Sequence, residues 1–173
     1  MRTPRALVSL LLLGLLGACA GRPGPAAWAA SVCDALTPWR TEIGALNERA
    51  QRQMDAATTP VQAKEHLVRL LTGAEKASET ARDRVARAGV PDVTEGEEVA
   101  AGFVASLAAT RDAYGKARTT VERLAVGDAT AFYAAVEVAM KTLTEEYGRS
   151  ALDTTKVRSV ELKRAFAEVP ECR

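Results

Sequence analysis

Apolar side chains recur at steps of three or four residues through most of this chain, in long stretches that proline or glycine interrupts. This spacing places the apolar side chains on one face of an α-helix, and no stretch alternates at the period of two that marks a β-strand. The pattern predicts an all-α protein with helical stretches over residues 28–54, 61–85, 99–124, 132–147 and 157–166.

Residues that start or stop helices separate these stretches. Thr59-Pro60 suits the N-cap and first position of the second helix, and Gly89-Val90-Pro91 is typical of its end. Thr94 and Glu97 have the spacing of a capping box before the third helix. Asp128 is expected to cap the fourth helix, which Gly148 ends or bends.

The lengths of these stretches predict how they pack. Each of the first three helices is about 30 residues, or roughly 45 Å, and the fourth helix and the last stretch together span a similar length. Short turns join neighbouring helices antiparallel. We therefore expect an up-down-up-down four-helix bundle with long helices, of which the last is broken.

The beginning of the chain has the pattern of an export signal. Arg2 and Arg5 precede an apolar run over residues 6–16, which is shorter than the about 20 residues of a membrane-spanning helix. Leu16-Gly17-Ala18-Cys19 follows, and it resembles the lipobox of bacterial lipoproteins. That resemblance implies cleavage before Cys19 and a diacylglycerol on its sulfur, whereas the alternative is an ordinary secreted protein with a chance cysteine at this point.

These features divide the chain into three parts. Residues 1–18 form the predicted lipoprotein signal peptide, and residues 19–26, rich in glycine and proline, form the lipidated tether. Residues 27–173 form a single helical-bundle domain. The lipid would anchor this domain at the extracytoplasmic face of the cell membrane.

Two cysteines remain after Cys19 is assigned to the lipid. Cys33 and Cys172 have one possible pairing, and disulfides persist in exported proteins, although two free thiols are the alternative. The predicted topology brings the start of the first helix and the end of the chain together, so we expect this bridge to join the termini. Closing so long a loop would stabilise the fold by roughly 4–5 kcal/mol on the chain-entropy model.

The net charge of the mature chain does not indicate that it binds a polyanion. The signal takes two of the 23 basic residues, which leaves 21 against 22 acidic residues in the mature chain. Basic and acidic side chains also alternate along the sequence without a basic block. A chain with this balance is not expected to bind nucleic acid or anionic lipid by charge.

The sequence contains none of the common catalytic or metal-binding patterns. His66 is the single histidine, which excludes the usual di-iron site, multi-histidine zinc sites and any serine triad that does not use it. The acidic pairs Glu97-Glu98 and Glu145-Glu146 point about 100° apart on a helix and suit helix starts or solvent. We therefore expect no enzyme, metal or cofactor.

Trp28 and Trp39 lie on the apolar face of the first helix and bracket Cys33. Core packing over the disulfide explains them. The functional alternative is an aromatic lining of a groove near the anchored end, where an acyl chain or peptide would bind. The many alanines in the second and third helices favour close helix contacts and a narrow core, which disfavours a large cavity.

Three motifs resemble those of small actinobacterial exported helical proteins to which no function is assigned. They are the opening Trp-x4-Cys-x-Ala-Leu-x2-Trp from Trp28 to Trp39, the central Gly-Val-Pro at 89–91, and the ending Ala-Phe-x3-Pro-x-Cys from Ala165 to Cys172. The resemblance spans nearly the whole mature chain. It implies the bundle and the bridge, and it brings no activity or active-site residue with it.

These observations favour a lipid-anchored, non-enzymatic binding or scaffolding module of the cell envelope, with an envelope protein as a possible partner. The first alternative is a carrier of a lipid or other apolar ligand between the helices, near Trp28 and Trp39. The second is an enzyme that uses scattered carboxylates. A carrier predicts a continuous apolar cavity, a scaffold an exposed apolar patch, and an enzyme a cleft of converging polar groups.

Overall fold

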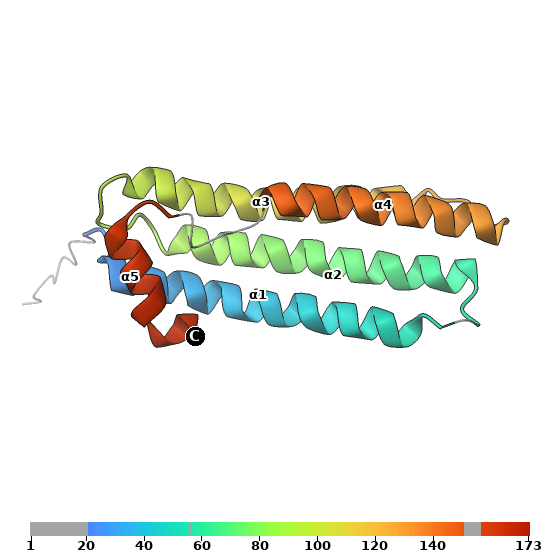
Figure 1. Cartoon of the computed structure of the whole chain (residues 1–173), viewed down its shortest axis with the longest axis horizontal. Helices are drawn as coiled ribbons and strands as arrows, with labels where there is room; N and C mark the ends of the chain where they lie inside the picture. Colours follow the sequence, from blue (N-terminus) through green and yellow to red (C-terminus); the bar gives the residue numbers. More distant parts are fainter. Residues whose placement is uncertain (1–20, 56, 151–156) are drawn as a thin grey trace, which may run out of the picture.

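A computed structural model describes residues 21–55, 57–150 and 157–173, so the predicted signal peptide and Cys19 lie outside the described residues. All the regular secondary structure in these ranges is helical, as the sequence predicts. The helices are α1 (Pro25–Gln53), α2 (Pro60–Arg87), α3 (Gly96–Glu122), α4 (Ala129–Ser150), α5 (Val160–Glu168) and the short 3-10 helix η2 (Pro170–Cys172) (Figure 1).

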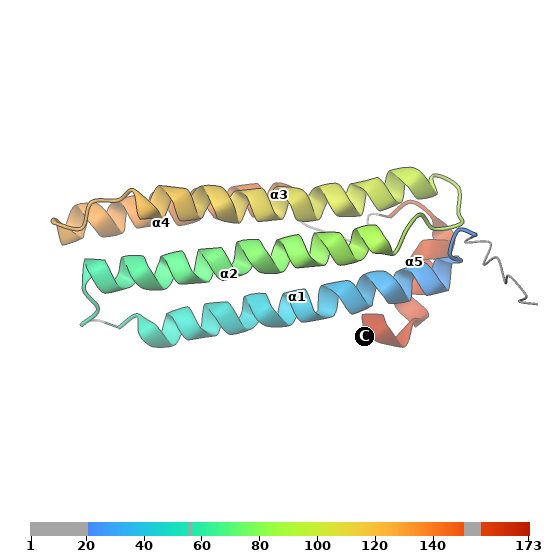
Figure 2. The same cartoon turned by 180° about the vertical axis from the view of Figure 1, so that it is seen from behind.

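The long helices lie along one axis. α1, α2 and α3 run side by side and antiparallel, and α4 lies beside the far half of α3 (Figures 1 and 2). Among the described residues, α4 packs on α3 and touches α2, and no close backbone contact joins it to α1. The fold is therefore helical, while the closed four-helix up-down-up-down bundle stays a prediction.

The two ends of this elongated molecule differ. We call the end that holds the start of α1, the α2–α3 connection and α5 the proximal end (Figure 1). The distal end holds the α1–α2 and α3–α4 connections. α5 crosses α1 near its start instead of extending α4, so the break predicted in the last helix is a change of direction.

Most of the predicted helix boundaries are confirmed by the caps. Thr59 and Gln62 form a capping box, in which the Gln62 amide donates to Thr59 Oγ1 (3.4 Å) and the Thr59 amide donates to Gln62 Oε1 (3.0 Å). Asp128 Oδ1 accepts a hydrogen bond from the Ala131 amide at 2.9 Å, at the start of α4. Gly89, just past α2, has a φ of 75°, which glycine adopts without strain.

The capping box predicted at Thr94 and Glu97 is wrong. α3 begins at Gly96, and the N-cap is Glu95, whose φ is 61° and whose side chain makes no capping hydrogen bond. The cause is the tight connection from α2. Gly96 is buried against the Pro91 carbonyl, where a Cβ atom would overlap the oxygen, so the chain turns around this glycine instead of around a side-chain cap.

The last two residues of the segment predicted as a tether, Pro25 and Ala26, belong to α1. Gly24 is its N-cap and Pro25 its first residue, where the missing amide of proline costs no hydrogen bond. The helix then continues for 29 residues, or about 43 Å.

The core forms two adjoining clusters along the long axis. The proximal cluster is centred on large side chains from α1, α3 and the C-terminal segment, whereas the distal cluster joins α2, α3 and α4 and is richer in alanine. Proximal members include Trp28, Val32, Leu36, Val85, Phe103, Leu107, Val157 and Leu162; distal members include Leu67, Leu71, Ala74, Ala113, Ala117, Val121, Ala139 and Leu143.

The predicted disulfide is present. Cys33 of α1 and Cys172 of η2 are bonded, with their Cα atoms 5.0 Å apart across a separation of 139 residues. α5 and η2 both pack against α1, and Ala165 and Val169 are buried against Ala29. The bridge therefore ties the end of the chain to the start of the first helix.

Candidate functional site

Trp28 is part of the proximal core. Its side chain is fully buried, and its indole N–H donates to the Gly89 carbonyl at 2.9 Å. The ring meets Phe103 and Phe166 edge-on, with centroids 5.3 and 6.0 Å away. Phe103 and Phe166 in turn stack at 5.8 Å. This arrangement matches the core-packing interpretation, because the indole has its hydrogen bond and its faces are covered.

Trp39 lies further along α1 in a different environment. Its indole N–H donates to Ser78 Oγ at 3.1 Å, and that hydroxyl donates to the Ala74 carbonyl at 2.8 Å. The ring lines a hollow of about 400 Å³ between α1 and α2, whose lining does not include Trp28. The two tryptophans therefore belong to the same core cluster, and of the two only Trp39 lines this hollow.

A larger hollow runs between α3 and α4. This α3–α4 groove has a volume of about 1100 Å³. Its floor consists of small and apolar side chains, and Val138 of α4, which is 66% exposed, stands in its lining. The floor residues are Ala113 and Ala117 of α3 and Ala139 and Leu143 of α4.

Charged side chains of both signs surround the α3–α4 groove. Lys116 Nζ lies 3.4 Å from Glu146 Oε1, which joins α3 to α4. Arg118 Nε lies 2.9 Å from Glu75 Oε2 and so joins α3 to α2, while its Nη1 lies 2.9 Å from Glu122 Oε1. These pairs hold the rim in place, and they bind both cations to carboxylates, of which there is one more than there are cations.

Gly115 makes part of this rim possible. A Cβ atom at this position would lie 2.9 Å from Glu75 Oε1, so the glycine leaves room for the carboxylate on the surface of α3. The same carboxylate accepts the hydrogen bond from Arg118. A Cβ atom at position 115 would therefore require the Glu75 carboxylate to shift from this place on the rim.

A second ion cluster joins α2 and α3 nearer the proximal end. Glu79 accepts hydrogen bonds from Arg82 (2.6 and 2.9 Å) and from Arg111 of α3 (2.8 Å). Hydrogen bonds from Arg82 and then Arg111 lower the pKa of Glu79 to about 2. Because this carboxylate is ionised and bound by two guanidinium groups, its role is to join two helices.

Tyr114 of α3 is a buried titratable side chain of the distal core cluster. Its ring is 8% exposed and lies 6.3 Å from the ring of Tyr147 of α4. Burial, with a smaller contribution from Tyr147, raises the pKa of Tyr114 to about 12. The phenol therefore stays neutral, and its role is to pack in the core.

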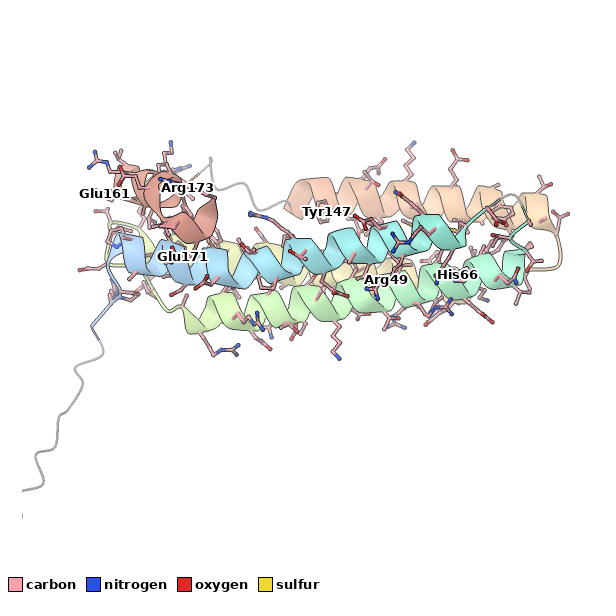
Figure 3. All side chains as sticks on the ribbon, turned by 90° about the horizontal axis from the view of Figure 1, so that it is seen from below. Arg49, His66, Tyr147, Glu161, Glu171 and Arg173 are labelled. Atoms are coloured by element: carbon pink, nitrogen blue, oxygen red, sulfur yellow. A yellow bond between two sulfur atoms is a disulfide. The ribbon has the colours of Figure 1, made fainter. Side chains whose placement is uncertain are left out.

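The remaining residues considered in the sequence analysis are dispersed. His66 lies on α2 toward the distal end, half-buried beside Arg69 (Figure 3), and it is not in the lining of the α3–α4 groove. Glu97 pairs with Arg22, and Glu146 with Lys116. In the described part of the chain, no three histidine, cysteine, aspartate or glutamate side chains are placed to hold a metal ion.

Sequence reasoning did not find the α3–α4 groove. The signal that could have indicated it is Val138, an apolar side chain off the apolar face of α4, opposite the small residues Ala113 and Ala117 of α3. Its depth depends on how closely two helices pack, which the helical period does not reveal.

Comparisons of this chain with protein-family models, with curated proteins and with solved structures found no match. Within residues 21–55, 57–150 and 157–173, no helix is both long and apolar enough to cross a membrane.

Proposed function

We propose that this protein is a lipid-anchored, non-enzymatic binding or scaffolding module of the bacterial cell envelope. Diacylglycerol on Cys19 would hold it at the extracytoplasmic face of the cell membrane, and an up-down-up-down helical bundle would be its exported domain. The lipobox residues Leu16–Cys19 support the anchor. The bridge between Cys33 and Cys172 fits an oxidising compartment.

The observation that carries the binding role is the α3–α4 groove. It is open, its floor is apolar, and its lining includes the exposed side chain of Val138. A groove between two antiparallel helices fits the apolar face of a third helix, as in many helix-in-groove complexes. The rim cations Lys116 and Arg118 already pair with acids, so a polyanion would find little free charge. We therefore propose a helix of an envelope protein as the partner.

A photo-crosslinking amino acid in place of Val138, in cells that export the protein, tests this role. We expect a crosslink to one defined envelope protein. The same amino acid in place of Glu137, exposed on α4 outside the groove lining, is the matched control and should give no such product. Ala135→Glu, which puts a charge into the groove lining, should abolish the Val138 crosslink. Identical products at positions 137 and 138 would contradict the proposal.

The carrier alternative rests on the hollow beside Trp39. An apolar ligand held there would lie against the indole and would remain with the purified protein. Native mass spectrometry of the protein extracted from membranes would then show a bound species besides the covalent lipid, and Trp39→Ala would release it. A single species without such a ligand would favour the scaffold.

A further inference from the structure

The residues just before α1 are fixed to the α2–α3 connection. Arg22 Nη2 lies 2.5 Å from Glu97 Oε1, at the start of α3. The Pro23 carbonyl accepts a hydrogen bond from the Asp92 amide at 2.8 Å, and the Gly24 carbonyl accepts one from the Trp28 amide at 3.0 Å. The segment that the sequence predicts as a free tether is therefore docked on the protein from Arg22 onward.

The surface that receives this segment is itself rigid. Pro91 is buried in the α2–α3 connection, and Gly96 packs on its carbonyl so closely that a Cβ atom would overlap it. Trp28 fixes the other side of the contact, because its buried indole is bonded to the Gly89 carbonyl. An exposed ion pair alone stabilises such a contact only weakly. Here backbone hydrogen bonds and the restricted φ of Pro23 add to the ion pair between Arg22 and Glu97.

The length of chain left over is short relative to the molecule. Cys19 precedes Arg22 by three residues, which reach at most about 10 Å when fully extended. α1 alone is 29 residues, or about 43 Å long, and the docked segment lies at one end of that length (Figure 1). An anchor at Cys19 therefore holds the proximal end, and the distal end lies several times further away than the tether reaches.

Two features of the proximal end bear on contact with lipid. Val160, the first residue of α5, is 67% exposed, and Glu161 beside it lies at this end of the molecule (Figure 3). The exposed charges here are of both signs, so attraction to anionic lipid does not decide the orientation. They are Arg22, Arg87, Arg158, Lys163 and Arg164 against Asp92, Glu95, Glu97, Glu98 and Glu161.

We propose that the proximal end is the surface that rests on the lipid bilayer, with the long axis of the bundle leading away from the membrane. The docked segment of residues 22–24 sets this orientation. In this orientation the α1–α2 and α3–α4 connections lie about 40 Å above the lipid surface, and the α3–α4 groove faces the envelope. This inference rests on the proposed anchor at Cys19.

Neutron reflectometry on a supported bilayer of phosphatidylethanolamine and phosphatidylglycerol tests the orientation. The chain that begins at Cys19 is attached through its native lipid or, without it, through the Cys19 thiol to a maleimide phospholipid; the disulfide leaves no other thiol. An upright bundle gives a protein layer about 40–45 Å thick, whereas a bundle lying flat gives about 20 Å, the width of two helices. A layer of about 20 Å for the wild-type chain would overturn the proposal.

A variant that frees the docked segment tests the cause. Arg22→Ala with Pro23→Gly removes the ion pair and the restricted φ, and we expect a thinner layer with a broader outer edge. Lys141→Ala, on an exposed side chain of α4, is the control and should keep the wild-type thickness. An unchanged layer in the double variant would overturn the role of residues 22–24. If the protein isolated from cells carries no lipid on Cys19, the proposed anchor is refuted. The chain coupled through maleimide would still report the orientation.

Discussion

The proximal and distal halves of this molecule are built from the same kind of helix and packed in different ways. In the proximal half, Trp28, Phe103 and Phe166 fill the core, and the disulfide ties the end of the chain to α1. In the distal half, small residues form the floor of the open α3–α4 groove, and Val138 in its lining is 66% exposed. The aromatic core and the covalent bridge therefore lie at the proximal end, and the exposed apolar side chain of the groove lies in the distal half.

Removal of the disulfide should have the largest effect. Cys33→Ser together with Cys172→Ser frees a loop of 139 residues, and we expect the free energy of unfolding to fall by about 4–5 kcal/mol. Urea unfolding followed by circular dichroism measures this loss. Cys19→Ser, which keeps the bridge, should leave the midpoint unchanged. A loss below about 1 kcal/mol in the double variant would show that the bridge is not what holds the proximal half.

Truncation of Trp28 should come next. Trp28→Ala removes a fully buried ring from the aromatic cluster and should cost about 3–5 kcal/mol of unfolding free energy. Trp28→Phe keeps an aromatic ring but loses the hydrogen bond to the Gly89 carbonyl, so it should cost less. In the distal half, Val61→Ala on a side chain that is 50% exposed is the control, with an expected loss below about 1 kcal/mol. Equal losses at Trp28 and Val61 would contradict the contrast between the halves.

Acid should weaken the ion cluster that joins α2 and α3. The pKa of Glu79 is about 2 in the folded protein and 4.5 ordinarily, because Arg82 and Arg111 bind the carboxylate. The unfolded chain therefore takes up the proton first as the pH falls. The stabilisation is present above pH 4.5 and is lost progressively toward pH 2.

Thermal unfolding at a series of pH values checks this effect. Glu79→Gln should remove part of the fall in melting temperature between pH 4.5 and 2. Glu137→Gln, on an exposed side chain of α4, should keep the wild-type profile. Parallel profiles for wild type and Glu79→Gln would contradict a stabilising role for this cluster.

The smallest effect is expected for a valine-to-alanine substitution in the α3–α4 groove, compared with the same substitution in the core. Val138→Ala in the groove should change the unfolding free energy by less than about 0.5 kcal/mol, because the side chain is exposed. Val121→Ala, which removes the same atoms from a fully buried side chain of α3, should cost about 1.5–3 kcal/mol. Chemical denaturation of both variants measures the difference. A large loss at Val138 would mean that this side chain supports the fold instead of facing a partner.

The sequence predicted the parts of the fold that depend on local chemistry. In the described residues, the helical period located each α-helix and missed the short 3-10 helix η2. The caps at Thr59 and Asp128 were correct because each depends on a side chain and an amide a few residues away. The bridge between Cys33 and Cys172 was also correct, because a single pairing was available. The caps and the bridge required no knowledge of how the helices lie on one another.

The errors arose where tertiary contacts override local preference. The capping box at Thr94 failed because the tight packing of Gly96 on the Pro91 carbonyl determines how α3 begins. The hydrogen bond from the Asp92 amide to the Pro23 carbonyl was not predicted, because it joins residues far apart in the chain. The α3–α4 groove was missed for the same reason, since its depth is set by the distance between helices.

The intact mass of the protein extracted from membranes tests the proposed anchor most directly. We predict a chain that begins at Cys19, carries the mass of a diacylglycerol, and is lighter by the two hydrogens of the Cys33–Cys172 bridge. Cys19→Ala should yield no lipidated form. A wild-type chain that bears no lipid and is released from the membrane without detergent would contradict the anchor.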